Sequence, residues 1–308
     1  MRNNFPVLII TYNRPKHLQL VINQVNKYHT GNLYISIDGP RDDKDYKKNK
    51  DIVELLSKKP IQKTITNLRV LDKNLGCKYH MSSAIDWFFS FEDAGIILED
   101  DCLPSKDFFP YCNEMLYKYK GCSKVMSITG MNFQNNKSRG DGSYYFSKFN
   151  HCWGWATWRS SWKFNDLELK LWPSVKNSNN WLSLHKDKFE RSHWNKVFDE
   201  LYEKNPSSWA YPWTLSVWSN LGLTVTPNVP LVENIGFDKN ATHTKSKNKV
   251  LTPKVSELGV IRHPKFIYQD IEADRYVYRT VFGGKQRQFP ISIFYGFIKF
   301  LKKIKTKL

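Results

Sequence analysis

Short aliphatic runs alternate with longer amphipathic stretches through the N-terminal part of the chain. The first run, residues 7–10, has the length and composition of a buried strand. The polar residues 11–14 follow it, and Pro15 suits the first turn of a helix. That helix would carry apolar residues at helical spacing, namely Leu18, Val21, Ile22 and Val25. The pattern predicts a strand, a polar loop and a helix that covers one face of a sheet.

The same unit recurs along the chain. Strands are predicted at residues 33–37, 68–71 and 95–98. Amphipathic helices are predicted over residues 42–59 and from about residue 79 to 91. Because strand-then-helix units repeat and polar groups gather at the strand ends, we expect an α/β fold with a doubly wound mixed sheet flanked by helices.

The last of these strands runs directly into Glu99, Asp100 and Asp101. Neighbouring carboxylates repel one another, and this repulsion raises their pKa values unless a cation lies between them. A divalent metal with oxygen ligands is the usual solution. In open α/β sheets, ligands also bind at the C-terminal ends of strands. The acids therefore suggest a metal and ligand site, although a solvated acidic turn would give the same pattern.

Two other strand ends carry polar candidates. The loop that follows residues 7–10 contains Arg14 and precedes a helix N-terminus, which together suit a phosphate group. The strand at residues 33–37 ends in Asp38, which precedes a tight Gly-Pro turn. An ordinary strand-loop-helix unit would show the same local features.

Taken together, these segments resemble a known family. Ile-Ile-Thr-Tyr-Asn-Arg-Pro, Ser-Ile-Asp-Gly-Pro, Asn-Leu-Gly and Ile-Leu-Glu-Asp-Asp-Cys-Leu-Pro-Ser-Lys-Asp-Phe-Phe occur in this order. This order is similar to the nucleotide-sugar half of GT-A glycosyltransferases, above all N-acetylglucosaminyltransferase I and related bacterial sugar transferases. The resemblance covers roughly residues 5–112.

The resemblance implies a role for each motif. Asp101 would bind Mn²⁺ or Mg²⁺, and Glu99 and Asp100 would lie next to the ribose and nucleotide. Arg14 would contact the diphosphate and Asp38 the base. The remaining residues that the resemblance places around the donor are Thr11, Asn13, Asn74 and Gly76.

The second half of the chain is rich in tryptophan. Ten of the eleven tryptophans lie between Trp153 and Trp218, which suggests aromatic surface concentrated in one region. Sugar rings present C–H faces that pack on aromatic side chains. Trp153, Trp155 and Trp209 are therefore candidates for an acceptor and donor-sugar pocket. Alternatively, most of these rings belong to the core.

Sugar transfer also needs a base for the acceptor hydroxyl. Inverting members of the family carry an Asp where this chain has Ala210, so Asp199, Glu200 and Asp238 are alternative candidates. A substitution or an inactive protein would also explain the alanine. The tract at residues 231–244 resembles bacterial members, and its His243 is a candidate for the metal or the diphosphate.

The C-terminal region is strongly basic. From Lys245 onward it holds fifteen Lys or Arg against four Asp or Glu. Its last stretch predicts a basic amphipathic helix suited to an anionic membrane surface, or else docked on the main domain. The apolar face of this helix consists of Phe294, Phe297, Ile298, Leu301 and Ile304.

Composition limits the setting. The 308 residues are 41% hydrophobic and carry a formal net charge of +18, which favours an anionic partner. Five cysteines without a CxxC pair indicate neither a disulfide framework nor a zinc site. The chain shows no signal segment and no membrane-spanning run, so we expect a cytoplasmic protein, peripheral at the inner face of the cytoplasmic membrane.

Together with these observations, the family resemblance implies a metal-dependent, inverting glycosyltransferase of bacterial cell-surface polysaccharide synthesis. It would move a hexosyl or N-acetylhexosaminyl group from a UDP-sugar to a glycan or lipid-linked acceptor. We expect a nucleotide-sugar half at 1–125, an aromatic-rich acceptor half at 126–245 and a basic extension at 246–308. A glycan-binding pseudoenzyme is the alternative. A nucleic-acid binder fits less well, since acids at strand ends would repel phosphates, so no nucleic-acid partner is expected.

Overall fold

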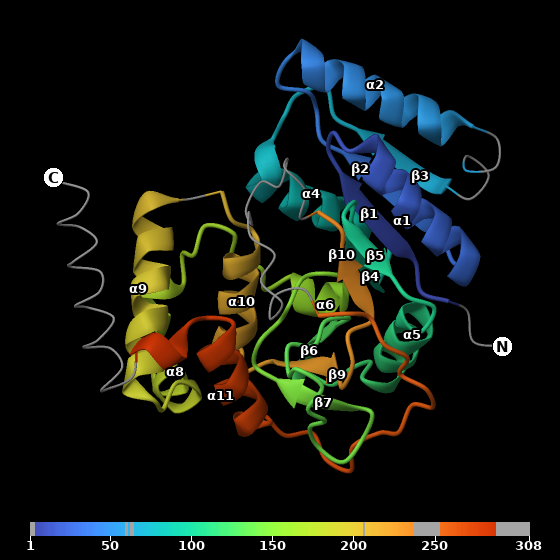
Figure 1. Ribbon diagram of the computed structural model, residues 1–308. Helices are drawn as coiled ribbons and strands as arrows, with labels where there is room; N and C mark the ends of the chain where they lie inside the picture. The colour runs from blue at the N-terminus through green and yellow to red at the C-terminus, as the bar shows by residue number, and fades with distance from the viewer. Residues whose placement is uncertain (1–3, 59–60, 62–64, 206, 237–252, 288–308) are drawn as a thin grey trace, which may run out of the picture.

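A computed structural model describes residues 4–58, 61, 65–205, 207–236 and 253–287 of the chain (Figure 1). The N-terminal half alternates strands and helices, as the hydrophobic pattern predicts. Its elements are β1 (Val7–Thr11), α1 (Pro15–Tyr28), β2 (Leu33–Ile37), α2 (Asp43–Ser57), β3 (Ile65–Val70), α4 (Gly76–Phe91), β4 (Ala94–Glu99), β5 (Cys102–Pro104) and α5 (Phe108–Lys118).

The second half contains short strands and a group of helices. They are β6 (Val125–Thr129), β7 (Tyr144–Ser147), β8 (Trp155–Trp158), α6 (Arg159–Trp162), α7 (Trp172–Val175), α8 (Asn179–Leu184), α9 (Lys188–Lys204), α10 (Ala210–Ser219), β9 (Leu223–Pro227), β10 (Val232–Asn234), α11 (Ile271–Thr280) and a 3₁₀ turn, η1 (Gly284–Arg287). Helices α8 to α11 gather at one side of the molecule, away from β1 to β3 (Figure 1).

One mixed sheet of eight strands runs through both halves, in the order β3-β2-β1-β4-β8-β6-β9-β7. Strands β3, β2, β1 and β4 are parallel, β8 is antiparallel to both of its neighbours, and β6 and β9 are again parallel to β4. The predicted α/β fold, with a mixed sheet flanked by helices, is confirmed. The parallel strands are aliphatic because both of their faces are covered.

The acidic stretch does not simply end a strand. Beyond Asp101 the chain forms β5, which pairs antiparallel with β10 in a separate two-stranded sheet. The hydrophobic pattern did not predict β5, because three residues that end in a proline give no periodic signal. This small sheet joins the acidic turn to a segment far along the chain.

Most of the tryptophans belong to the core, which confirms the alternative interpretation, and the predicted concentration of aromatic surface is wrong. Of the ten between Trp153 and Trp218, every one except Trp153 is buried. Their rings pack on one another, as in Trp162–Trp213 with ring centroids 5.1 Å apart and Trp194–Trp218 at 4.9 Å. Aromatic rings bury a large apolar area, which suits a half of the domain whose strands are short.

The described part of the C-terminal region lies against the main body. Gln269 forms a bridge with Phe146 of β7, and Ser143 and Arg262 are joined by hydrogen bonds. The expected boundary at 245/246 and the basic amphipathic helix lie outside the described residues, so the domain division and the helix stay predictions. Within the described ranges, no helix combines the length and apolar character that a membrane span requires.

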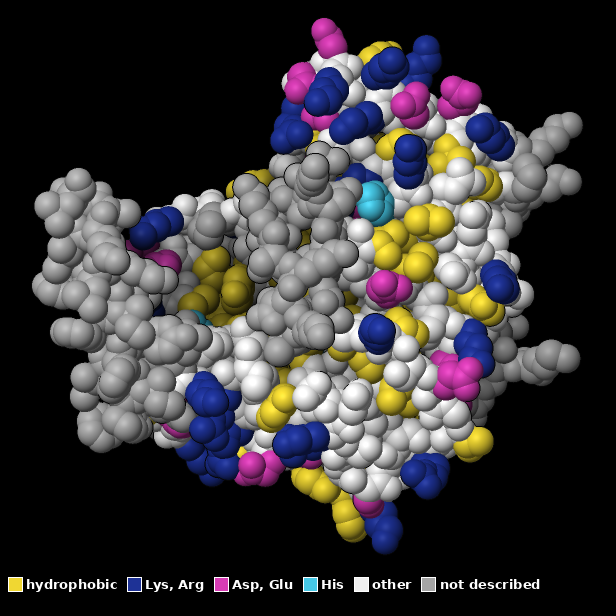
Figure 2. Space-filling model, viewed as in Figure 1, with side chains coloured by type: hydrophobic (Ala, Val, Ile, Leu, Met, Phe, Trp, Pro, Cys, Tyr) yellow, Lys and Arg dark blue, Asp and Glu magenta, His cyan; other side chains and the backbone are white. Residues whose placement is uncertain are grey.

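The charged side chains on the surface are mixed in sign in places. On the face drawn in Figure 2, Lys and Arg side chains are widely spread, and over α2 they alternate with Asp and Glu. Helix α2 shows why, because its sequence, DKDYKKNKDIVELLS, interleaves both signs along the exposed face.

A buried ion pair joins the segment after β7 to helix α9. The Lys148 ammonium, which follows β7, lies 2.7 Å from a carboxylate oxygen of Glu190 on α9, and both side chains are almost inaccessible. The same ammonium donates to the backbone carbonyl of Leu184 at 3.2 Å. Removal of one partner from such a pair leaves an uncompensated buried charge.

We therefore expect Glu190→Gln to lower the free energy of unfolding by about 3–5 kcal/mol, measured by chemical denaturation. Glu257→Gln is the matched control, because Glu257 pairs with Lys106 on an exposed surface where water screens the interaction. The control should unfold like the wild-type protein. Equal unfolding midpoints for all three proteins would contradict this account of the buried pair.

Candidate functional site

The C-terminal ends of β1, β2, β4 and β6 lie at the same edge of the sheet, because these strands are mutually parallel through β8. Strand β8 runs in the opposite direction, so it begins at this edge. Ile10 lies beside Glu99, and Ile97 lies beside Trp155. The acidic turn is therefore flanked by the loop after β1 on one side and by residues 150–154 on the other.

The acidic turn is held by groups from the end of β1. An oxygen of Asp100 accepts a hydrogen bond from the Thr11 hydroxyl at 2.7 Å and from the Tyr12 backbone N–H at 3.4 Å. The Arg14 guanidinium lies 2.8 Å from Asp101 and 3.6 Å from the other oxygen of Asp100. The structure thus brings together the acids, Thr11 and Arg14, as the sequence predicts.

One guanidinium does not neutralise the whole turn. Burial raises the pKa of Glu99 to about 8, with further contributions from the charges of Asp101 and Asp100 and an opposing one from Arg14. Burial and the charge of Asp101 raise the pKa of Asp100 to about 6, against Arg14 and the Thr11 hydrogen bond. Among the residues that the structure describes, the positive partners do not balance the negative potential of the turn, and such a site would attract a further cation.

The buried carboxylate of Asp38 organises a turn. One oxygen accepts from the backbone N–H groups of Gly39 at 2.9 Å and Leu75 at 2.8 Å. The other accepts from the Asn74 amide at 3.0 Å and the Gly76 N–H at 3.1 Å. These four donors match the number of acceptor positions on a carboxylate. Asp38 fixes the start of α4, and a contact with a base would have to displace one of these bonds.

Asn13 faces α2 and belongs to a polar cluster that the sequence did not predict. Its amide donates to Asp45 at 2.7 Å, and the same carboxylate accepts from the Tyr12 hydroxyl and from Arg41. Although burial opposes ionisation of Asp45, these hydrogen bonds lower its pKa to about 2. Asp45 gave no signal because it is one acid among many charges in α2.

The main chain that follows β10 lies close to Asp101. The Ile235 N–H donates to the Asp101 carbonyl at 2.8 Å, and a Cβ atom at Gly236 would lie 2.3 Å from an Asp101 carboxylate oxygen. Only glycine fits at that position without a shift of the carboxylate. Two of the predicted candidates, Asp238 and His243, follow directly in the chain and lie outside the described residues.

The acids suit a metal site in which the protein supplies some of the ligands and a bound molecule supplies the others. Among the residues that the structure describes, no three His, Cys, Asp or Glu side chains are grouped so that they could hold a metal ion. Magnesium-type sites commonly use one or two carboxylates together with substrate phosphates. The raised pKa values of Glu99 and Asp100, which a bound cation would lower, and the partly exposed carboxylate of Asp101 suit that second kind of site.

The three candidate tryptophans separate in the structure. Trp153 is half-buried at the sheet edge and packs edge-on against Phe133, with ring centroids 6.0 Å apart. Trp155 and Trp209 are stacked on each other at 5.8 Å and are only 1% and 5% exposed. Trp153 is therefore the one of these three that a ligand could contact without repacking the core.

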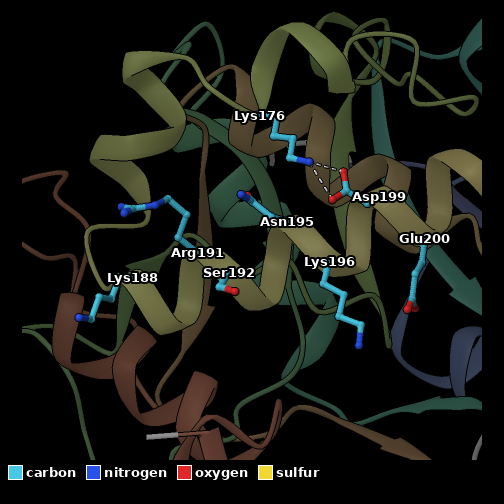
Figure 3. Close-up of a pocket in the computed structure, with 8 residues that line it drawn as sticks. All are labelled: Lys176, Lys188, Arg191, Ser192, Asn195, Lys196, Asp199 and Glu200. Atoms are coloured by element: carbon cyan, nitrogen blue, oxygen red, sulfur yellow. Dashed lines mark hydrogen bonds and ion pairs between the residues drawn. The ribbon is translucent and has the colours of Figure 1, made fainter. Parts of the chain in front are cut away.

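The candidate bases on α9 lie in another part of the molecule. Helix α9 is at the outer side, with α10 between it and the strands in the view of Figure 1. Asp199 points toward Lys176, whose ammonium lies 2.8 Å from both carboxylate oxygens, and Glu200 points away (Figure 3). Both acids line an open cavity of about 560 Å³ on the helix surface.

The carboxylate of Asp199 makes contacts that hold neighbouring elements together. It accepts a hydrogen bond from the indole N–H of the buried Trp172 at 2.9 Å, besides its ion pair with Lys176. Burial opposes ionisation, but these hydrogen bonds lower the pKa of Asp199. Ala210 is the first residue of α10, and the structure does not bring either α9 acid together with Asp101.

Within residues 150–154, sequence reasoning named Trp153 but missed the backbone contacts of the loop. The Thr129 hydroxyl donates to the His151 carbonyl at 2.7 Å, and the Gly130 N–H donates to the Gly154 carbonyl at 2.7 Å. Gly154 has φ +66°, and a side chain there would meet Val232 of β10. The only signal in the sequence was the Trp-Gly-Trp tract, which drew attention to the rings and not to the backbone of the loop.

No protein-family model and no curated protein sequence matches the chain. Among solved structures, it is similar to a cytidylyltransferase from Leptospira borgpetersenii, at 11% identity over 63% of this chain and 74% of that chain, with a TM-score of 0.35. It is also similar to 4-diphosphocytidyl-2C-methyl-D-erythritol synthase from Anaerococcus prevotii, at 12% identity over 64% and 84%, with a TM-score of 0.32.

A third similar structure is the apo form of the glycosyltransferase GlyE from Streptococcus pneumoniae. The identity is 10%, the match covers 66% of this chain and 51% of that chain, and the TM-score is 0.30. The chain thus spans about half of that glycosyltransferase. At TM-scores this low the similarity carries no argument about activity, and functional conclusions depend on the site itself.

The raised pKa of Glu99 predicts a pH dependence of stability. Between its ordinary pKa and about 8, the folded protein holds a proton at Glu99 that the unfolded chain releases, so the titration of this group lowers the stability of the wild type as pH rises from 5 to 8. Glu99→Gln removes this titration. In a buffer without divalent metal, the stability of the variant relative to wild type should increase over that range.

Thermal unfolding at pH 5 and pH 8 would measure this difference. Glu54→Gln, on the exposed face of α2, is the control and should follow the wild type at both pH values. A constant difference between Glu99→Gln and wild type across the range would show that Glu99 titrates normally.

Proposed function

We propose that this protein is a glycosyltransferase that uses a nucleotide sugar, most simply a UDP-sugar, together with Mn²⁺ or Mg²⁺. The observation that supports the proposal best is the joint placement of Arg14 and the acids at the end of β4. A guanidinium that bridges two carboxylates presents both the cation that a diphosphate needs and the oxygens that a metal needs.

Each group at this edge has a task in such a reaction. Asp101 would hold the metal, which supplies Lewis-acid stabilisation of the departing diphosphate. Arg14 would donate hydrogen bonds to phosphate oxygens, since a guanidinium forms strong charge-assisted bonds with them. Thr11 keeps Asp100 in place, and Asp38 keeps the turn at Asn74 and the start of α4 in a fixed position beside the donor.

The proposal extends to the acceptor side. The transferred group would be a hexosyl or N-acetylhexosaminyl residue, passed with inversion to a glycan or lipid-linked acceptor in bacterial cell-surface polysaccharide synthesis. The half-buried ring of Trp153 supports a sugar site beside the acids. The net charge of +18 supports a position at the anionic inner face of the cytoplasmic membrane.

Ala210 favours a second candidate, a glycan-binding pseudoenzyme. A carboxylate expected at the start of α10 is replaced by a methyl group there. Such a protein would bind the nucleotide without turning it over. Release of UDP from a bound UDP-sugar, or transfer of its sugar, would exclude this candidate.

Calorimetric titration of UDP into the protein tests the nucleotide site. We expect binding that strengthens with Mn²⁺ and that weakens at least about tenfold in Asp101→Asn, because the variant keeps the shape of Asp101 but loses its charge. Asp51→Asn, an exposed acid on α2, should bind as the wild type does. Failure of the wild-type protein to bind UDP with or without metal would overturn the proposal.

A further inference from the structure

The loop between β1 and α1, residues 12–14, brings the Arg14 guanidinium to the acidic turn. The loop has no regular secondary structure. Arg14 occupies the N-cap position of α1, but its side chain makes no capping hydrogen bond and reaches Asp100 and Asp101 instead. The start of the helix therefore does not orient the guanidinium, and the position of Arg14 depends on what holds the rest of the loop.

Helix α2 supplies the contacts that hold it. The Asp45 carboxylate accepts a hydrogen bond from the Asn13 amide at 2.7 Å and another from the Tyr12 hydroxyl. Tyr12 and Asn13 are the two residues directly before Arg14. The loop is thus held on one side by a carboxylate of α2 and on the other by the carboxylates that follow β4.

Asp45 is itself fixed in place. Its side chain is only 5% exposed, and its backbone N–H donates to the N-cap carboxylate of Asp42 at 2.8 Å. The Nε–H group of Arg41 donates to Asp45 at 2.9 Å, and the Arg41 guanidinium lies 5.2 Å from the centre of the Tyr12 ring. A buried carboxylate that accepts from three side chains has little freedom to turn.

The polar cluster does more than attach α2 to the sheet. Helix α2 already buries an apolar face, formed by Ile52, Leu55 and Leu56. Burial of the Asp45 carboxylate costs free energy, and a packed apolar side chain would attach the helix at least as well. A network of hydrogen bonds, in contrast, fixes the direction of its members as well as their proximity. The cluster is therefore suited to hold the loop in one conformation.

We propose that Asp45 is a positioning residue of the nucleotide site, which holds residues 12–14 so that the Arg14 guanidinium reaches the diphosphate of the donor. This inference rests on the proposed glycosyltransferase function. Arg14 would exchange its contacts with Asp100 and Asp101 for contacts with phosphate oxygens. Because the main chain of the loop is held from α2, the exchange needs only a rotation of the Arg14 side chain.

A loop held in this way favours binding for a simple reason. A ligand that binds only one loop conformation loses apparent affinity in proportion to the time that the loop spends elsewhere. A loop without its bonds to Asp45 that is competent about a tenth of the time would bind the diphosphate about tenfold more weakly. The effect would reach the ligand only through Arg14, since Asp45 itself is buried.

UDP affinity in the presence of Mn²⁺ tests this role, measured by NMR titration, which also detects weak complexes. Asp45→Asn keeps the shape of the side chain but replaces one acceptor oxygen by an amide group that can only donate. We expect UDP binding about tenfold weaker than in the wild type. Asp43→Asn is the matched control, because it removes the same charge from an exposed position in the same turn, and it should bind UDP as the wild type does.

A double-mutant cycle shows whether Asp45 acts through Arg14. Arg14→Gln should itself weaken UDP binding, and addition of Asp45→Asn to this variant should then cause no further loss. A purely structural role of Asp45 would weaken binding to the same extent in both backgrounds. Asn13→Ala leaves Asp45 paired with Arg41, so it should fold where Asp45→Asn does not. Its smaller loss of affinity should show the same dependence on Arg14.

The outcomes separate this inference from the function beneath it. Wild-type UDP affinity in the folded variants, an equal loss in Asp43→Asn, or an undiminished effect in the Arg14→Gln background would each overturn the positioning role of Asp45 while leaving a nucleotide site. Absence of UDP binding to the wild-type protein would overturn the proposed function, and the role of Asp45 with it.

Discussion

The site depends on one interaction, the contact of the Arg14 guanidinium with the two carboxylates that follow β4. Buried strands end there in carboxylates that repel one another, and Arg14 is the cation that bridges Asp100 and Asp101. The bridge requires β1 and β4 to be neighbours in register, which in turn requires the helices that cover them. Even with Arg14 in place, burial and the neighbouring acids raise the pKa values of Glu99 and Asp100, and this is the physical reason for proposing a further cation at this edge.

The sequence predicted the N-terminal half well for a physical reason. Its parallel strands are buried on both faces, so each appears as an aliphatic run followed by polar residues, as at Ile10 and Thr11. The contact between Arg14 and the acids could be expected because parallel strands end at one edge. The four bonds to Asp38 could not, since three of them come from backbone groups that carry no signature of their own.

The second half was harder to predict because its hydrophobic and polar residues show no regular alternation along the chain. Strands of three or four residues, such as β5, β8 and β10, are too short to show alternation. The tryptophans suggested a surface for sugars, yet their size makes them effective in filling a core between short elements, as Trp155 and Trp213 do. The contacts of the loop before β8 could not be predicted, because they depend on the antiparallel direction of β8, which the sequence does not show.

The close approach of Gly236 to Asp101 links the two ends of the domain. The main chain that follows β10 covers the Asp101 carboxylate, which we expect to hold the metal. This close approach is possible only because residue 236 has no side chain. A fragment that stopped after α5 would contain every acid of the turn and Arg14. It would lack the main chain at Gly236 that covers Asp101, and also the loop before β8. The proposed nucleotide site therefore depends on both halves of the chain, and its affinity for a donor would report on the folding of the second half as well as the first.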